Sequence, residues 1–250
     1  MVGRGVLEGR VNSKKIQSVT INMTSFFVWY VANRAGLYAL DAASRRIAAY
    51  WPRFPRPEDS EAYYVSQRDV AYLGVNSLLE TCFLLHVRDA LPTAFPPLSP
   101  VYCVFGVYIL FWLDDLFYTW FHALLHRPRL YTLLHAHHHA VTRPTRGYVD
   151  AGNEHPLEQC GAMFGHMCAI RFLVFLYHGL LYTDVHVPVL LHLTLKALGS
   201  CLNHVDHAVY LPLGMGVCID TAYHREHHTR RRCNYAQFVP MCDRLVTRGD

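Results

Sequence analysis

Long apolar stretches separated by short polar connections dominate the pattern of the chain. They lie at residues 16–33, 70–87, 90–113, 161–182 and 185–202. Each approaches the ~20 residues that a helix needs to cross a bilayer, although Arg171 and Lys196 interrupt the last two. One soluble core of this size does not need so many long apolar segments. The pattern therefore predicts an all-α, integral membrane helical bundle, with buried core helices of a soluble protein as the alternative.

Two helical hairpins are predicted, because only a short junction separates the members of each pair. Residues 70–87 pair with 90–113, and residues 161–182 pair with 185–202 across Thr183 and Asp184. This gives about four spans, and the chain returns to the same side of the membrane after each hairpin. Residues 16–33 form a further segment that either spans the membrane or lies in its interface. We divide the chain into an N-terminal segment, residues 1–66, and a main domain, residues 67–250.

Composition and charge agree with a membrane protein. Hydrophobic residues make up 52% and charged residues 17%, whereas soluble chains average roughly 25% charged. The net charge of +4 is spread over short basic clusters, which gives no case for nucleic acid. Arginines flank the histidine-rich segments and predict that these lie on the cytoplasmic side. The eight cysteines contain no Cys-x-x-Cys pair, so a disulfide scaffold and a zinc ribbon are both disfavoured.

Histidine is the unusual component, with 17 in the chain. Four groups have helical spacing: His122 and His126; His135, His138 and His139; His204 and His207; His224, His227 and His228. Positions i, i+3 and i+4 share a helix face, so each group is predicted to present its imidazoles to one point. Ten imidazoles exceed one ion and suit two metal ions with about five nitrogen donors each. Imidazole ligands alone do not distinguish iron, zinc, copper and nickel. The number of histidines disfavours a structural zinc site, which has four ligands.

Two carboxylates are candidate supports for these histidines. Asp115 lies seven residues before His122 and Asp220 lies four before His224, which places each acid on its partner's predicted helix face. Metal-bound histidines usually donate their second N–H to a carboxylate or carbonyl. The alternative is that both acids are solvated residues at helix ends. His137 is predicted to point away from the ligand face or to support it, and His166 and His192 are predicted to be interior histidines.

The ordered motifs resemble one family of membrane enzymes. The run from Asp114 to His126, Leu-His-Ala-His-His-His from Leu134 and His-Pro-Leu-Glu from His155 resemble the sterol desaturase and fatty acid hydroxylase superfamily. The Tyr-His-Arg-Glu-His-His run ending at His228, followed by Asn-Tyr-Ala-Gln-Phe-Val-Pro, adds to the resemblance, which covers about residues 100–246. Two departures, Ala123 for a usual arginine and Cys242 for a frequent tryptophan, put the subfamily in doubt.

The resemblance implies a histidine-bound di-iron centre, two Fe per chain, on a cytosolic cap of an endoplasmic reticulum membrane enzyme. It implies O2 as oxidant and electrons from NAD(P)H through cytochrome b5 and its reductase. The ligands carried over by position are His122, His126, His135, His138, His139, His204, His224, His227 and His228. The assignment of His207 as a ligand rests mainly on its spacing from His204. Residues 67–250 would then be a fatty acid hydroxylase or sterol desaturase domain.

The expected function is that of an oxidoreductase in lipid biosynthesis that hydroxylates or desaturates a sterol, a sphingolipid or a fatty acyl chain. An unactivated C–H bond offers no acidic proton or carbonyl, so it calls for redox metal chemistry rather than acid–base groups. A divalent-metal transporter is an alternative, but transporters hold their ligands near the middle of several spans. Two further hypotheses for the function are a zinc hydrolase and a family member without activity.

Overall fold

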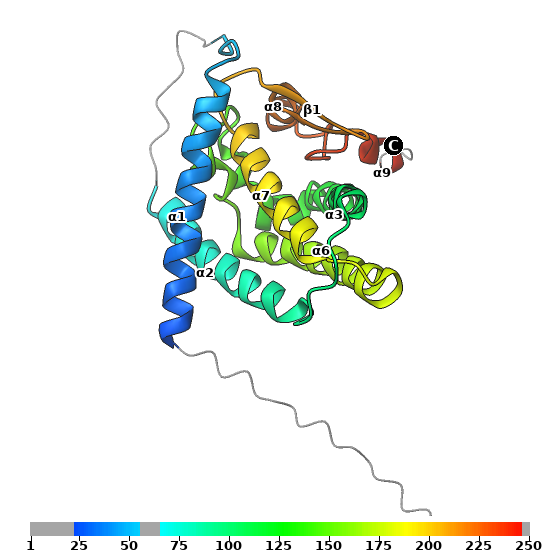
Figure 1. The fold of residues 1–250 in the computed structure, drawn as a ribbon. Helices are drawn as coiled ribbons and strands as arrows, with labels where there is room; N and C mark the ends of the chain where they lie inside the picture. The colour runs from blue at the N-terminus through cyan, green and yellow to red at the C-terminus, as the bar shows by residue number, and fades with distance from the viewer. Residues whose placement is uncertain (1–22, 56–65, 247–250) are drawn as a thin grey trace, which may run out of the picture.

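The computed structural model describes residues 23–55 and 66–246, so residues 16–22 of the first predicted segment lie outside the described residues. Helices make up most of the described chain (Figure 1). The elements are α1 (Met23–Ala48), α2 (Gln67–Ala90), α3 (Pro100–Leu125), α4 (Pro128–Leu130), η1 (Tyr131–His135), η2 (His138–Ala140), α5 (Tyr148–Ala151), α6 (Pro156–Val174), η3 (Phe175–Leu181), α7 (His186–Asn203), β1 (Tyr210–Gly214), β2 (Val217–Asp220), α8 (Thr221–Arg230) and α9 (Met241–Val246). The predicted all-α class is confirmed, with one short β-hairpin added.

Local sequence signals set the starts of the long helices. α2 begins with a capping box, in which the Ser66 hydroxyl accepts from the Asp69 N–H at 3.2 Å and the Asp69 carboxylate accepts from the Ser66 N–H at 2.6 Å. α3 and α6 each begin with proline, whose fixed φ suits the first helical position. His155 caps α6, because its Nδ1 accepts from the Leu157 N–H at 3.1 Å.

Within residues 23–55 and 66–246, three helices are long and apolar enough to cross a membrane: α2, α3 and the continuous α6–η3 helix, Pro156–Leu181. Their polarity is the reverse of that in a soluble protein. In α2, Val70 and Leu78 are exposed whereas Asn76 and Thr81 are buried. Lipid favours an apolar exterior and tolerates polar groups where they are paired inside the bundle. The distribution therefore supports a membrane bundle over the soluble alternative.

Both predicted chain reversals lie together, at the ends of α3 and α7 that are remote from the predicted ligand histidines. The Thr183 hydroxyl donates to the Pro97 carbonyl at 3.2 Å, and His186 Nε2 donates to the Pro92 carbonyl at 2.9 Å. The members of each predicted hairpin are not the main packing partners, however. α3 packs chiefly on α6 and α7, and α2 packs chiefly on α6 and α1. The hairpins therefore interleave into one bundle.

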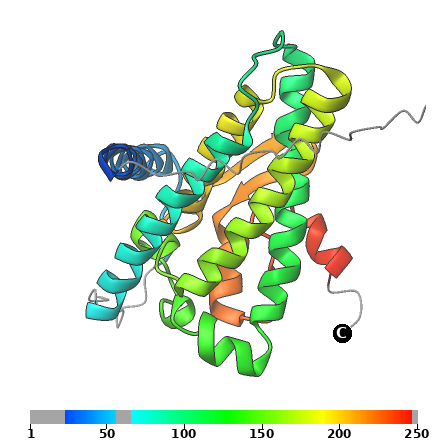
Figure 2. The same ribbon diagram turned by 90° about the horizontal axis from the view of Figure 1, so that it is seen from below.

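The orientation of α1 differs from that of the candidate spans. In Figure 2 α1 is seen end-on, whereas α2, α3 and α6 run along the plane of the picture. α1 packs chiefly on α7, and its Asp41 carboxylate accepts from the Tyr148 N–H at 2.9 Å. Arg34 extends this contact, since its guanidinium donates to the Tyr148 hydroxyl at 2.8 Å. α1 thus crosses the bundle steeply and is tied to the segment before α6.

Close packing of α6 on α3 depends on two glycines one turn apart. A Cβ at Gly161 would lie 2.3 Å from the Phe121 ring, and a Cβ at Gly165 would lie 2.0 Å from the Phe117 ring. Small residues at this spacing let membrane helices approach closely. The approach brings the last turn of α3, with His122, beside the first turn of α6, with Glu158.

The β-hairpin lies between α7 and α8 in the sequence and flanks α3 in space. β1 and β2 are antiparallel, with Tyr210 opposite Asp220 and an irregularity between Pro212 and Gly214. The Tyr108 hydroxyl of α3 donates to the Leu213 carbonyl at 2.5 Å, and Trp112 Nε1 donates to the Met215 carbonyl at 3.0 Å. The hairpin leads directly into α8, so these contacts help to fix the helix that carries three of the predicted ligands.

Candidate metal centre

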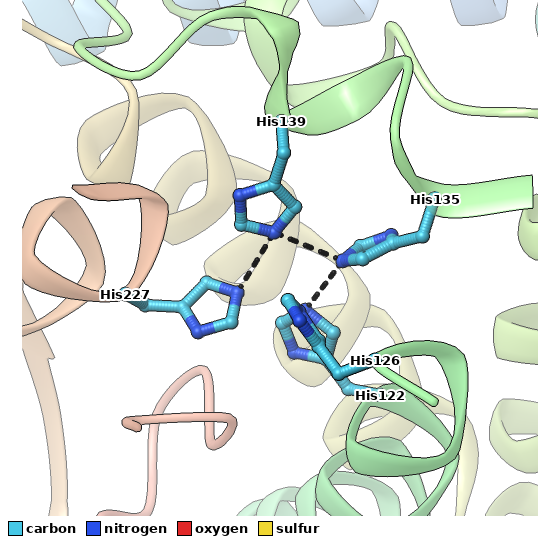
Figure 3. A group of neighbouring side chains, drawn as sticks. All are labelled: His122, His126, His135, His139 and His227. Carbon is cyan, nitrogen blue, oxygen red and sulfur yellow. Dashed lines mark hydrogen bonds between the residues drawn. The ribbon is translucent and has the colours of Figure 1, made fainter. Parts of the chain in front are cut away.

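Nine of the ten predicted ligands gather into two adjoining groups. The five-histidine group consists of His122, His126, His135, His139 and His227, and the four-histidine group consists of His138, His204, His224 and His228. Within each group the ring nitrogens that could serve as ligands lie within 4.8 Å of one another. Figure 3 shows the five rings of the first group pointing toward one another from α3, η1, η2 and α8.

The predicted presentation of each motif to a single point is confirmed for His122 and His126 and is wrong for both His-x-x-His-His motifs. His135 and His139 belong to the five-histidine group, whereas His138 belongs to the other. The reason is local backbone geometry, because His135 ends the π-helix η1 and His138 begins the 3₁₀ turn η2. In α8, His224 and His228 share one group and His227 faces the other. Each His-x-x-His-His motif therefore contributes to both groups.

His207 belongs to neither group among the described residues. Its backbone forms an isolated bridge with Arg53, and its carbonyl accepts from the Thr221 hydroxyl at 2.7 Å. The helix α7 ends at Asn203, so the i, i+3 spacing from His204 does not place the two rings on one helix face. The spacing argument for His207 therefore fails where the helix ends.

Hydrogen bonds at Nδ1 determine which nitrogen faces each group. His122 Nδ1 donates to the Tyr235 carbonyl at 2.8 Å, and His135 Nδ1 donates to the Glu158 carboxylate at 2.7 Å. A neutral imidazole with its proton on Nδ1 has a lone pair on Nε2. The Nε2 atoms of His122 and His135 are 3.0 Å apart, so two lone pairs face each other there.

The same arrangement recurs around the other rings. Nδ1 donates to a backbone carbonyl in His227, at 2.7 Å to Cys233, in His228, at 3.0 Å to Val141, and in His204, at 2.8 Å to Ser200. His139 Nε2 lies 3.0 Å from His135 Nε2 and 3.1 Å from His227 Nε2. His224 Nε2 lies 3.2 Å from His204 Nε2 and 3.1 Å from His228 Nε2. One N–H cannot satisfy two such neighbours, so shared protons do not explain the clusters.

Protonation does not relieve the repulsion either. Burial lowers the pKa of His135 and of His227 to about 3, and burial with neighbouring histidines holds the pKa of His138, His224 and His228 well below the ordinary value. The imidazoles are therefore neutral near pH 7. Nitrogen ligands ~2.1 Å from one ion lie about 3.0–3.4 Å apart when they are adjacent, which matches the observed separations. The residues present fit a cation in each group.

Glu158 is a candidate functional residue that the spacing of histidines alone does not identify. It is 3% exposed and lies in the His-Pro-Leu-Glu motif, three residues after His155 and within the first turn of α6. Its carboxylate fixes the tautomer and orientation of His135, which is the usual role of an acid next to a metal-bound histidine. The signal available in the sequence was that motif.

Asp115 supports His122 indirectly. Its carboxylate accepts backbone N–H bonds from Gln237 at 3.0 Å, Phe238 at 3.2 Å and Val239 at 2.6 Å, and it makes no hydrogen bond with a histidine in the described part of the chain. These bonds hold the segment whose Tyr235 carbonyl accepts from His122. Asp115 therefore positions the acceptor instead of serving as one.

Two other acids complete this comparison. Asp243 accepts from the Tyr235 N–H at 2.8 Å and the Ala236 N–H at 3.0 Å, so it holds the same segment from the other side. Asp220 is the N-cap of α8, because its carboxylate accepts from the Tyr223 N–H at 3.0 Å. Asp220 is therefore a residue at a helix end, as in the alternative hypothesis, and it does not support His224. His137 also points outside both groups, toward Asn153 and Asp69 at 3.0 Å each.

A cavity of about 220 Å³ reaches the four-histidine group from between the helices. His138, His204 and His224 line it, whereas no member of the five-histidine group does within the described residues. Its apolar wall comes from α1, α2, α6 and α7, and includes Leu37, Leu84, Met163 and Leu193. Its polar lining includes Glu80, Tyr118, Tyr148, Glu154, His166 and Lys196. The cavity can therefore bring an apolar molecule from the bundle to one histidine group.

Fold and site together define a helical membrane protein with histidine groups able to hold metal. The fatty acid hydroxylase family model matches residues 107–247, which is more than half of the chain and includes both groups. The chain belongs to the fatty acid hydroxylase family, and the resemblance to the wider superfamily is confirmed. Its members and relatives are enzymes of lipid metabolism.

Named relatives share the same region. The chain is 30% identical to Protein CER1-like 1 of Arabidopsis thaliana over 135 residues, 52% of this chain and 21% of that protein. It is 29% identical to Very-long-chain aldehyde decarbonylase GL1-6 of Oryza sativa subsp. indica over 152 residues, 54% and 21% of the two chains. The chain thus spans about a fifth of the length of the curated relatives it matches. No solved structure matches it.

Proposed function

We propose that this protein is a membrane-bound, O2-dependent di-iron oxidoreductase that hydroxylates or desaturates a lipid. The observation that carries the proposal is the cavity between the candidate spans that ends at the four-histidine group. The five-histidine and four-histidine groups would each hold one iron, and a bound iron pair supplies the redox chemistry that an unactivated C–H bond requires.

The chain's own residues have three roles in this proposal. The carbonyls of Tyr235, Cys233 and Val141 and the Glu158 carboxylate keep Nδ1 protonated, so that Nε2 faces each ion. The apolar helices around the cavity hold the lipid chain and exclude water from the reacting carbon. The four-histidine group is the site at which substrate is presented, because it alone borders the cavity in the described structure.

The substrate class includes sterols, sphingolipids and fatty acyl chains. A second candidate reaction is the removal of a carbonyl carbon from a long-chain aldehyde, because several relatives are named very-long-chain aldehyde decarbonylases. Electrons would come from NAD(P)H through cytochrome b5 and its reductase. We place the protein in the endoplasmic reticulum with the histidine groups toward the cytosol, since arginines flank those groups.

The test combines metal analysis of detergent-purified protein with lipid profiling of cells that express the wild type or His138→Ala. The proposal expects two irons per wild-type chain and a new hydroxylated or desaturated lipid that the variant does not produce. An alkane one carbon shorter than a supplied aldehyde would favour the second candidate. A wild type without bound iron, or a lipid change that persists in His138→Ala, would contradict both.

A further inference from the structure

A second set of buried ionisable groups lies apart from the nine clustered histidines. Asp114 of α3 is 2% exposed and contacts three side chains: His166 Nδ1 at 2.6 Å, His192 Nε2 at 3.6 Å and the Lys196 ammonium as an ion pair. His166 comes from α6, and His192 and Lys196 come from α7. Ionisable groups among candidate membrane helices are costly and usually serve a function. The cluster therefore calls for an explanation beyond packing.

A third metal ion is not that explanation. Asp114, His166 and His192 could offer three ligand atoms within 4.8 Å of one another. The Lys196 ammonium, however, contacts the same Asp114 oxygen that lies nearest to His192. A divalent cation there would be repelled by the ammonium at short range and low dielectric. Lys196 already supplies the positive charge that the carboxylate needs.

Lys196 also borders the cavity that reaches the metal centre. Lys196 and Ser200 lie one turn apart on α7, His204 directly follows the last residue of that helix, and all three line that cavity. The rise of a helix places Lys196 on the order of 10 Å below the ligand His204. An ammonium has three N–H donors, and the contacts of Lys196 are Asp114 and the ring faces of Tyr118 and Phe238. Donor capacity remains for a molecule in the cavity.

The charges around the cavity restrict what that molecule can be. The Asp114–Lys196 pair is already neutral, and Glu80 and Glu154 line the same cavity. A carboxylate ligand would add a negative charge that no unpaired lysine or arginine among the described lining residues balances, and it would do so away from water, which is unfavourable. A neutral hydroxyl or carbonyl oxygen can accept from the ammonium without that cost. The cavity therefore suits an uncharged oxygen function.

We infer that Lys196 binds a hydroxyl or carbonyl oxygen of the lipid substrate, on the order of 10 Å from the carbon presented to the four-histidine group. The inference rests on the proposed function and narrows its substrate class. It favours a neutral lipid with an oxygen remote from the reacting carbon, such as a sterol or a fatty alcohol derivative. A simple aldehyde has its only oxygen at the reacting end, so its alkyl chain would face the ammonium.

The test measures equilibrium binding to the purified full chain, which requires no turnover. Competition against a radiolabelled sterol compares cholesterol with cholestane, and 1-octadecanol with octadecane and octadecanoate. We expect the wild type to prefer each alcohol over its hydrocarbon by about tenfold, the scale of one hydrogen bond to a charged donor, and over the carboxylate by at least as much. Whichever pair shows the preference identifies the source of the oxygen, sterol or acyl chain.

The matched variant is the double substitution Asp114→Asn with Lys196→Met, because removing Lys196 alone would leave a buried unpaired carboxylate. We expect hydrocarbon binding to stay unchanged and the preference for alcohol to disappear. Equal preference in wild type and variant, no preference in wild type, or a third metal ion lost in the variant would each overturn the inference. Binding that discriminates alcohols in a protein without iron or product would overturn the proposed function and leave this inference standing.

Discussion

The five-histidine and four-histidine groups are built from the same segments yet differ in their access to the rest of the molecule. Five rings surround one point in the first group, and none of the five lines the cavity in the described structure. Four rings define the second, and three of them border the cavity. Catalytic metal sites generally keep a coordination position free of protein ligands. Under the proposed function, the contrast favours substrate presentation at the four-histidine group and a more closed, supporting position for the five-histidine group.

The two groups also differ in what orients their rings. In the five-histidine group, His135 donates to the Glu158 carboxylate, and His122 donates to a carbonyl in the segment that Asp115 and Asp243 hold. In the four-histidine group, His204 and His228 donate to carbonyls of Ser200 and Val141. Carboxylates thus support one group directly or through the backbone, whereas backbone carbonyls orient these two rings of the other. Substitutions of acids should therefore separate the two groups.

The largest effect is expected for His138→Ala, which removes a ligand at the cavity. Turnover should fall by at least about 10²-fold, because the loss of even an outer partner of a metal ligand costs 10–100-fold. The iron content should fall from two toward one per chain, as measured by elemental analysis. His207→Ala is the matched control, since His207 lies outside both groups, and it should keep both irons. Equal losses in the two variants would undo the assignment of the groups.

A smaller effect is expected for Glu158→Gln. The amide replaces the carboxyl acceptor of His135 Nδ1, so the metal affinity of the five-histidine group should fall by about 10–100-fold. Chelator titration of the purified protein should show one weakened ion and one unchanged ion. Asp89→Asn, which alters an exposed ion pair with Arg88, is the control and should titrate like the wild type. Two ions weakened equally would show that the groups do not act separately.

Stability should respond more to Asp115→Asn than to Asp220→Ala. The Asp115 carboxylate is 1% exposed and accepts three backbone N–H bonds, so an amide there should cost about 2–4 kcal/mol. Asp220 caps α8 with one bond, and its removal should cost about 1 kcal/mol. Thermal unfolding of both variants in detergent measures the difference. A cost at Asp115 no larger than that at Asp220 would contradict its role in holding the 237–239 backbone.

A pH-dependent loss of stability is expected in metal-depleted protein. The pKa of His135 and His227 is about 3 in the fold and near 6.5 in the unfolded chain, so the unfolded state binds more protons between these values. Stability should be complete above about pH 6.5 and should decline as pH falls toward 3. The melting temperature should therefore drop between about pH 7.5 and pH 5, and His135→Gln should show a smaller drop. An equal drop in that variant would exclude His135 as a source of the dependence.

The sequence by itself determined the helical membrane class and the set of histidines. Apolar stretches of nearly spanning length are local properties, and so are the His-x-x-His-His motifs that identify the family. The sequence also contained Glu158 within a recognisable motif, although spacing alone gave it no role. For these features the information lies in neighbouring residues, and no long-range contact is needed to read it.

Only the tertiary structure decided which histidine joins which group. Helical spacing predicted one point per motif, and this holds for His122 and His126. It fails where the π and 3₁₀ turns at 131–140 and the end of α7 at Asn203 change the directions of the rings, and in α8, where His227 faces the other group. Asp115 likewise gained its role from a segment more than a hundred residues away. The physical reason is that ring direction and hydrogen-bond partners depend on backbone irregularities and on contacts between distant segments, which residue spacing does not contain.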